Sequence, residues 1–280
     1  MPRETATPSS RKHLIAVFSE HSGVKARLSG RSARWVFAAA LAATGTALAF
    51  DESADGERSL PRSIEAVAWK LTTTYYATTS EAGAYDVNLR GNFGSHTGWV
   101  GYYDQPGEFS QARVGYEYNL SLPLTQAVLS AQYASQGFFG GSATAEVGGD
   151  FYALLGISRT NEKPYFNLNF DPNDAWTFGL GARLPHDTSF MLYQIHGEWI
   201  DAGQRVTHAV YRTKPTPDTR VGIDAFYKYG PLGSDEGGTV RTAGVSVAFD
   251  YKAWFARIAW DPKVNFTPND MVRVAVGMRF

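Results

Sequence analysis

The chain ends on an alternating stretch, residues 270–280, DMVRVAVGMRF, and this stretch decides the predicted fold. One set of alternate positions is apolar: Val272, Val274, Val276, Met278 and Phe280. The other set holds Met271, Arg273, Ala275, Gly277 and Arg279. Successive side chains of a β-strand point to opposite faces. The period of two therefore predicts a strand whose two sides meet different solvents.

This stretch resembles the C-terminal targeting strand of Gram-negative outer-membrane β-barrels, in which a terminal phenylalanine follows apolar residues at every second position. Met278 departs from the pattern, because many members carry an aromatic residue there. The resemblance is to the broad, porin-like class and reaches no subfamily. It implies residence in the bacterial outer membrane, in contact with its lipid and lipopolysaccharide. It also implies insertion by the barrel assembly machinery, which would read residues 270–280.

A second pattern lies near the N-terminus. Basic residues between positions 25 and 34 precede the apolar run 35–49, WVFAAALAATGTALA, which ends in the small residues Ala47 and Ala49. A basic flank, an apolar centre and a small-residue exit predict a signal peptide over 1–49, cleaved after Ala49. The run is shorter than the roughly 20 residues of a membrane-spanning helix. An uncleaved anchor is the alternative, and Val24 is an alternative translation start.

Composition narrows the class of the mature protein. Without residues 1–49 the chain keeps 19 basic and 25 acidic residues, and the basic ones are dispersed. No nucleic-acid partner is expected from that distribution. The absence of cysteine excludes thiolate chemistry and disulfides. No apolar run after Ala49 is long enough for a membrane helix, so an exported membrane protein of this sequence must span as a closed sheet.

Strands are predicted throughout the mature chain. Residues 50–65 predict a polar periplasmic lead-in, and residues 66–280 predict an all-β, closed antiparallel transmembrane β-barrel, because alternating aromatic-rich segments are separated by turn-rich spacers. We expect fourteen strands, or twelve if a weak pair merges. Their predicted ranges are 66–78, 83–93, 97–105, 109–121, 124–136, 146–160, 163–171, 174–184, 189–200, 204–214, 219–229, 239–251, 253–261 and 270–280.

An even number of strands puts both ends of the barrel in the periplasm. The long connections 137–145, 230–238 and 261–269 then all fall on the external side. The third strand is ambiguous, because either Trp99 and Tyr103 or Val100 and Tyr102 are able to form its outward face.

Charged side chains are expected on the inward face, because a lipid-facing Arg or Lys at mid-bilayer costs about 2–4 kcal/mol. We interpret most of them as pairs across a wet wall. The sharper alternative is an anion-favouring constriction, in which closure of the sheet brings Arg257 and Arg273 near Arg90 and Arg113. The pore-lining candidates are Arg90, Arg113, Glu117, Arg183, His196, Glu198, Asp224, Lys228, Arg257 and Arg273.

The predicted function is a passive or weakly selective pore for small hydrophilic solutes, with a narrow water path unless loops plug it. One alternative is an outer-membrane enzyme acting on lipid or peptide, with His196, Glu198 and His208 as its first candidates, since a His beside a carboxylate serves as a general base. No matching nucleophile motif is found, so no enzymatic activity is expected. A third alternative is a structural or adhesive barrel acting through its external loops.

No metal site and no cofactor are expected. The acidic residues of 171–174 and 235–236 are able to bind calcium loosely at external loops. Such residues more often make turns.

Overall fold

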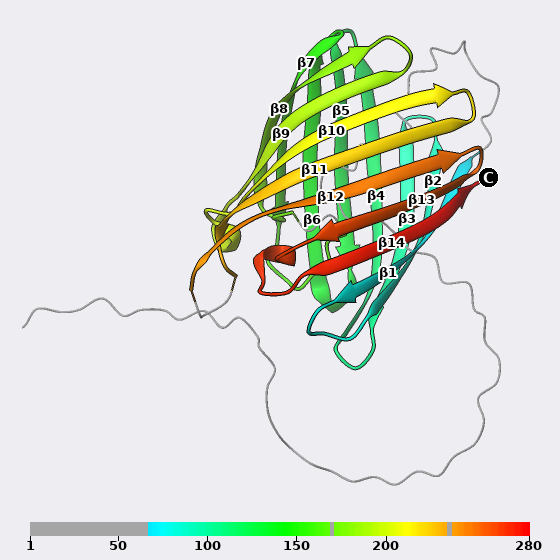
Figure 1. Cartoon of the computed structure of the whole chain (residues 1–280). Helices are drawn as coiled ribbons and strands as arrows, with labels where there is room; N and C mark the ends of the chain where they lie inside the picture. Colours follow the sequence, from blue (N-terminus) through cyan, green and yellow to red (C-terminus); the bar gives the residue numbers. More distant parts are fainter. Residues whose placement is uncertain (1–66, 169–170, 234–236) are drawn as a thin grey trace, which may run out of the picture. The chain divides into compact units, whose positions relative to one another are not determined.

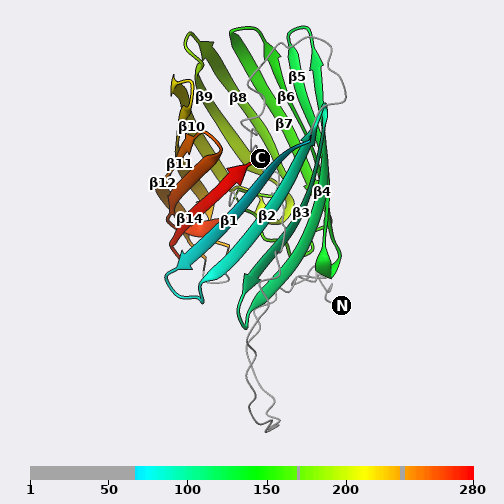
Figure 2. The same cartoon turned by 90° about the vertical axis from the view of Figure 1, so that its right-hand side faces the viewer.

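The computed structural model describes residues 67–168, 171–233 and 237–280, and these form a closed barrel of fourteen antiparallel strands. The strands slant around the barrel, and β14 lies beside β1 (Figures 1 and 2). The predicted all-β barrel is confirmed, with fourteen strands rather than twelve. The predicted signal peptide and lead-in lie outside the described residues. The strands are β1 (Ala68–Thr78), β2 (Ala84–Phe93), β3 (His96–Gln105), β4 (Phe109–Leu122), β5 (Thr125–Ala134), β6 (Phe138–Gly148), β7 (Phe151–Thr160), β8 (Ala175–Leu184), β9 (Thr188–Gly197), β10 (Arg205–Thr216), β11 (Thr219–Pro231), β12 (Thr239–Tyr251), β13 (Trp254–Asp261) and β14 (Met271–Arg279).

Helical structure is limited to short 3₁₀ turns in the connections. They are η2 (Ser135–Gly137), η3 (Trp199–Asp201) and η4 (Val264–Phe266). No helix in the described part of the chain is long and apolar enough to cross a membrane.

The two ends of the barrel differ in the length of their connections. At the turn end, where β1 begins, the strands are joined by two or three residues, as at 94–95 and 185–187. At the opposite, loop end several connections are longer, and these include 161–174, 198–204, 232–238 and 262–270. The predicted external connections near 230–238 and 261–269 are therefore confirmed as long segments that share one end of the barrel.

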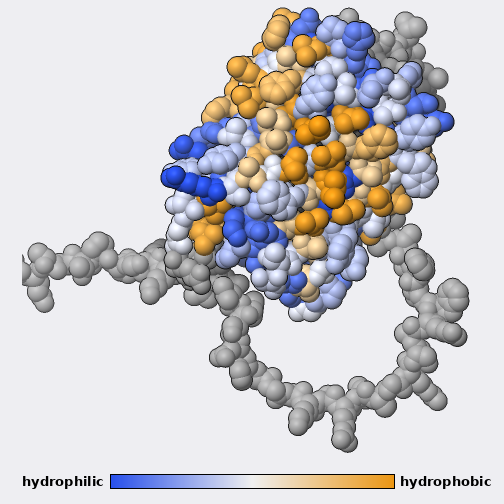
Figure 3. Space-filling model, in the orientation of Figure 1, coloured by the Kyte–Doolittle hydropathy of each residue, from blue (hydrophilic) through white to orange (hydrophobic). Residues whose placement is uncertain are grey.

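The outside of the barrel is apolar along the middle of the strands. On β14, Val272, Val274 and Val276 are exposed while Met271 and Ala275 are buried, as the alternation predicted. Hydrophobic residues gather over the middle of the strands on the face seen in Figure 3, and hydrophilic residues lie toward their ends. An outward apolar band on a closed sheet is the surface of a transmembrane β-barrel.

The ambiguous third strand is resolved by burial. On β3, Trp99 and Tyr103 point inward and are each only 3% exposed, whereas Val100 and Tyr102 lie on the outside. Trp99 fits inward because it packs over Gly115 on β4, where a Cβ atom would lie 2.2 Å from the indole ring. Two large aromatic side chains of β3 thus point into the lumen.

The pair of strands that closes the barrel, β1 and β14, stays hydrogen-bonded as far as the last residue of the chain. Trp69 and Phe280 exchange two backbone hydrogen bonds, of 2.8 and 3.0 Å. Gly277 permits close approach at this seam, because a Cβ atom there would lie 2.2 Å from the Leu71 carbonyl oxygen and from the Phe255 ring. On the Phe255 ring sit two cations, Lys70 and Arg279, at 4.9 and 5.1 Å from its centroid.

Three of the predicted ranges, one loop and two strands, are wrong, although their errors cancel in the strand count. The predicted external loop 137–145 falls mostly in β6, and the predicted strand 146–160 joins the end of β6 to β7. The predicted strand 163–171 belongs to the connection between β7 and β8. The longest connection of the barrel was therefore taken for a strand.

Candidate channel and its constriction

The lumen face of the barrel carries most of the charge. Inward carboxylates on the strands are paired with inward cations. Asp86 accepts from Arg113, Glu117 from Arg90, and Glu146 from Arg183. Asp261 accepts from Lys228, and Asp250 lies 2.7 Å from Arg279. Paired charges on a wall that faces away from lipid agree with the interpretation of cross-strand pairing.

The connection between β7 and β8, residues 161–174, crosses the lumen, and we call it the constriction loop. Its first half packs on β4 and β5. Gln111 donates to the Pro164 carbonyl at 2.9 Å and accepts from the Phe166 amide at 3.1 Å. Arg113 donates to the Phe166 carbonyl at 3.2 Å. These bonds satisfy loop backbone groups that would otherwise be buried without partners.

Aromatic stacking holds the same half of the constriction loop. The Phe166 ring stacks on Tyr103 with centroids 3.6 Å apart, and it meets Tyr76 edge-on at 5.1 Å. Tyr165 stacks on Phe138 at 4.0 Å, and its hydroxyl donates to Gln132 at 2.8 Å. Burial raises the pKa of Tyr165 to about 12, so this hydroxyl stays protonated at neutral pH.

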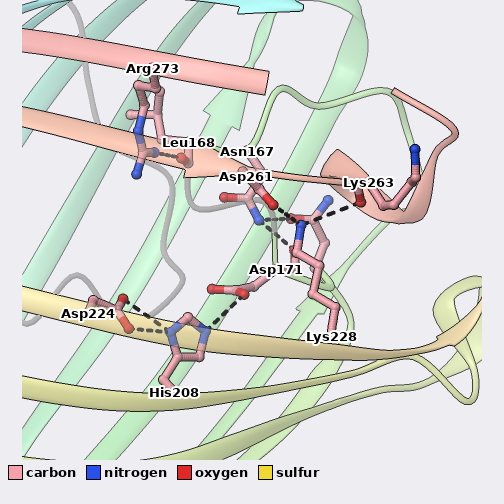
Figure 4. A network of polar contacts seen from close by, with 10 residues as sticks. Asn167, Leu168, Asp171, His208, Asp224, Lys228, Asp261, Lys263 and Arg273 are labelled. Atoms are coloured by element: carbon pink, nitrogen blue, oxygen red, sulfur yellow. Dashed lines mark hydrogen bonds and ion pairs between the residues drawn. The ribbon is translucent and has the colours of Figure 1, made fainter. Parts of the chain in front are cut away.

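The second half of the constriction loop is bound to the opposite wall (Figure 4). Arg273 on β14 donates to the Leu168 carbonyl. His208 on β10 lies between two carboxylates, with Nε2 3.3 Å from Asp171 of the loop and Nδ1 2.9 Å from Asp224 on β11. Because β4 and β10 are six strands apart in the barrel, the loop acts as a strut across the lumen.

The loop is also braced within itself and where it returns to the wall. Asn167 donates to the Asp171 carbonyl at 2.7 Å. Asp174 accepts from the Thr160 hydroxyl at 2.6 Å and from the Thr160 amide at 2.9 Å.

The next connection at the loop end, residues 198–204, contains Asp201, and burial raises the pKa of this carboxyl group.

Water access differs along the lumen. Beside the constriction loop, the paired side chains of Arg113 and Asp86 are covered, at 0% and 1% exposed. Toward the turn end Arg257 faces inward yet is exposed, and the Arg183 side chain is 40% exposed. Two solvent-exposed inward cations, Arg183 and Arg257, therefore lie toward the turn end of the lumen.

Apolar side chains line one side of the lumen, and this was not predicted. Met191, Tyr193 and Ile195 of β9 point inward and join Tyr152, Leu154, Ala175 and Val210 in one buried cluster. The cations Arg90, Arg257, Arg273 and Arg279 lie on strands β2, β13 and β14 across the closing seam. Part of the inner wall over β7 to β10 is thus apolar, and four inward arginines lie around the seam.

The predicted arginine constriction is brought together only in part. Arg90 and Arg113 each hold a carboxylate, and Arg273 holds the constriction loop. Arg257 is the member of the four that is exposed to the lumen. Glu117, Arg183, Asp224 and Lys228 also face inward, each within the ion pairs or histidine contacts given above. The pore-lining role of these residues remains a prediction.

The predicted orientation of His196 is wrong. Its ring packs 4.9 Å from Phe178, an outward residue of β8, and its strand neighbours Met191, Tyr193 and Ile195 are the ones that point inward. Glu198 lies beyond the end of β9 and pairs with Arg159 at 2.5 Å. The apolar cluster in the lumen explains why the prediction was wrong. Both faces of β9 are largely apolar, so the few polar residues of the strand did not indicate which face points inward.

The catalytic alternative loses its residue set for the same reason. His196 lies outside the barrel, His208 lies inside, and Glu198 lies at the rim. Both ring nitrogens of His208 contact carboxylates, which leaves neither nitrogen for a substrate.

No group of three metal-binding side chains is found within the described residues. In the 171–174 segment, Asp171 contacts His208 and Asp174 contacts Thr160 instead of gathering around a cation site. The other calcium candidate, 235–236, lies outside the described residues.

Comparisons with known proteins give structural neighbours only. No family model matches the chain, and no curated protein matches it. Among solved structures, the barrel is similar to the outer membrane protein Omp33 of Acinetobacter baumannii, with 12% identity, a TM-score of 0.49, and 76% of this chain and 98% of that chain covered. OprD from Pseudomonas aeruginosa gives 12% identity and a TM-score of 0.41 over 76% and 93%. OmpF of Salmonella typhi, in complex with daunomycin, gives 11% and 0.41 over 77% and 97%.

Proposed function

We propose that the chain forms a narrow pore in the bacterial outer membrane, with small hydrophilic solutes as its cargo and the constriction loop as its selective element. The loop end faces the exterior, and the turn end, where β1 begins and β14 ends, faces the periplasm. The cleaved signal peptide and recognition of Val272 to Phe280 by the barrel assembly machinery belong to this proposal.

One observation carries the proposal. Arg257 faces the lumen from the middle of β13 and is exposed to solvent, while its outward neighbours Ala256 and Ile258 lie on the apolar exterior. A cation in that position requires water inside the barrel, since an unsolvated charge is costly to bury. Water at Arg257, together with a loop that crosses the lumen, supports a solute pathway through the barrel.

An exposed cation on the lumen face supports weak selectivity for anions. Arg257 is such a cation. Rings of charged side chains select ions at close quarters. We therefore expect anions to pass more readily than cations of the same size.

Single-channel conductance in a planar bilayer tests the proposal, with refolded protein under a salt gradient. Discrete steps and a reversal potential on the anion-selective side are expected. Arg257→Glu is expected to move the reversal potential toward cation selectivity, whereas Lys252→Gln, an exposed position at a turn, is expected to leave it unchanged. Silence from protein that shows the folded-barrel gel shift would contradict the pore.

A further inference from the structure

On the described strands, every arginine that faces outward lies at the same end of the barrel. The outward arginines are Arg159 on β7, Arg205 on β10 and Arg241 on β12, and all three lie at the loop end. The remaining outward strand positions are mainly apolar or aromatic. A charge facing lipid is costly at mid-bilayer but costs about 0–1 kcal/mol near the interface. This placement therefore fits the headgroup level.

The strand registers align these cations with aromatic rings in a single row. Trp176 pairs with His196, His196 with Arg205, Arg205 with Tyr229, and Tyr229 with Arg241. Adjacent strands lie about 4.8 Å apart, so the row spans roughly 19 Å from β8 to β12. We call these five residues the outward row.

The guanidinium groups are pre-positioned by the rings. Arg241 lies 5.2 Å over Tyr229, and Arg159 lies 5.3 Å over Trp176. Trp176 and Tyr229 are themselves 47% and 39% exposed, as residues of an interfacial girdle are. Arg159 is paired with Glu198, but within the described part of the chain Arg205 and Arg241 contact no carboxylate. Among the described residues, the outward row thus presents two cations that face outward without a carboxylate contact.

Next to the outward row, toward the middle of the strands, lie further polar groups. Gln194 donates to the Thr207 hydroxyl at 2.6 Å, and His196 contacts Gln194. Hydrophilic residues also gather at this end of β9 to β12, at the left of Figure 3. Hydroxyl and amide groups just below the cations complement the polar linkage region of a lipid beneath its phosphate.

We infer that the outward row is a binding site for the phosphate of a phosphorylated glycolipid of the outer leaflet. Arg205 and Arg241 would bind the phosphate oxygens, because arginine matches phosphate geometry through paired N–H donors. Trp176 and Tyr229 would sit at the headgroup boundary. The inference rests on the proposed placement in the outer membrane, but it does not depend on conduction.

Native mass spectrometry of the refolded full barrel in detergent tests the site, with bis-phosphorylated lipid A titrated as the probe. Stoichiometric retention is expected for the unaltered protein. Arg205→Gln with Arg241→Gln is expected to weaken retention at least about tenfold, since each surface cation contributes to binding an anionic lipid. The control, Lys214→Gln with Lys252→Gln, removes two cations at the turn end and is expected to retain the lipid.

Other outcomes would overturn the site. One is equal retention of lipid A by both double variants, and another is that the protein binds lipid A without phosphates as well as the phosphorylated form. Either result would show that the outward arginines do not bind the phosphate. Displacement of the lipid by inorganic phosphate at equal concentration would point to a free-anion site. Dimers or trimers that form without lipid and are lost in the Arg205/Arg241 variant would assign the row to contacts between copies. The gel shift confirms that each variant is folded, and the conductance assay separates this result from the pore proposal.

Discussion

Asp171 of the constriction loop lies 3.3 Å from His208 Nε2 on β10, and this contact fastens the loop to the wall opposite its other anchors. The same histidine holds Asp224 at 2.9 Å through Nδ1. A single imidazole thus joins the loop to two neighbouring strands.

Asp171→Asn tests that anchor, because it keeps the size of the side chain and removes its charge. A hydrogen bond to a charged group contributes about 1.5–3 kcal/mol. We expect a looser loop, seen as higher single-channel conductance with more frequent current fluctuations. Asp187→Asn, an exposed carboxylate 3.6 Å from Lys214 at the turn end, is the control and is expected to change neither. Identical recordings from both variants would show that the loop is held without His208.

Asp86→Asn is expected to lower stability strongly. It leaves the Arg113 guanidinium buried beside a neutral amide, and removing one member of a buried ion pair costs about 3–5 kcal/mol. The matched control is Glu146→Gln, because its partner Arg183 is 40% exposed. This variant is expected to lose about 1 kcal/mol or less of its free energy of unfolding. Urea unfolding midpoints in detergent measure both. Equal shifts would mean that Arg113 is stabilised mainly by its bond to the Phe166 carbonyl.

Tyr165 gives the constriction a dependence on high pH. Its folded pKa, about 12, lies above the ordinary value of 10.0 because the ring is buried. The stability it contributes is therefore complete below pH 10 and is lost as pH rises toward 12. Conductance is expected to stay constant up to about pH 10 and then to increase.

Tyr165→Phe lacks the titrating hydroxyl and is expected to remove this alkaline step. Tyr85→Phe, at an exposed outward position, is expected to keep it. Absorbance of tyrosinate, followed with the conductance, identifies the group. A step that survives in Tyr165→Phe would assign the transition to another residue.

Gly277→Ala is expected to weaken the closing seam. The added Cβ meets the Leu71 carbonyl oxygen and the Phe255 ring at 2.2 Å, so backbone must shift, and overpacking typically costs about 1–3 kcal/mol. Gly98→Ala is the control, since its nearest neighbour would be Phe93 at 3.8 Å. The folded fraction on a heat-modifiability gel, measured after refolding, compares the two. No difference would indicate that the seam adjusts freely.

Alternation made the exterior predictable. Val272, Val274 and Val276 face outward, on the side of each strand that meets hydrocarbon. Because that side must be apolar, every second residue of a strand is apolar. The strand count and the closed topology follow from the same pattern, since backbone groups in lipid must be paired within the sheet.

The interior was harder to predict, because the lumen imposes no single chemistry. In β6 the run from Gly140 to Ala145 is built of small residues and resembles a loop. In the constriction loop, Phe166 and Leu168 alternate like strand residues, although they pack against the buried Tyr76 and Tyr103 from a loop. On β9, inward Met191 and Tyr193 are as apolar as the outward residues, so periodicity alone does not distinguish the faces. Only the pairing with β8 and β10 fixes them.

Arg273 links the constriction to the assembly of the barrel. It lies on β14, the strand that pairs with β1 to close the sheet, and it binds the carbonyl of Leu168, 105 residues earlier in the chain. The strand that closes the sheet therefore also carries one support of the constriction loop. A folding intermediate in which β14 is not yet in place would therefore lack both the closed seam and this contact between Arg273 and the constriction loop.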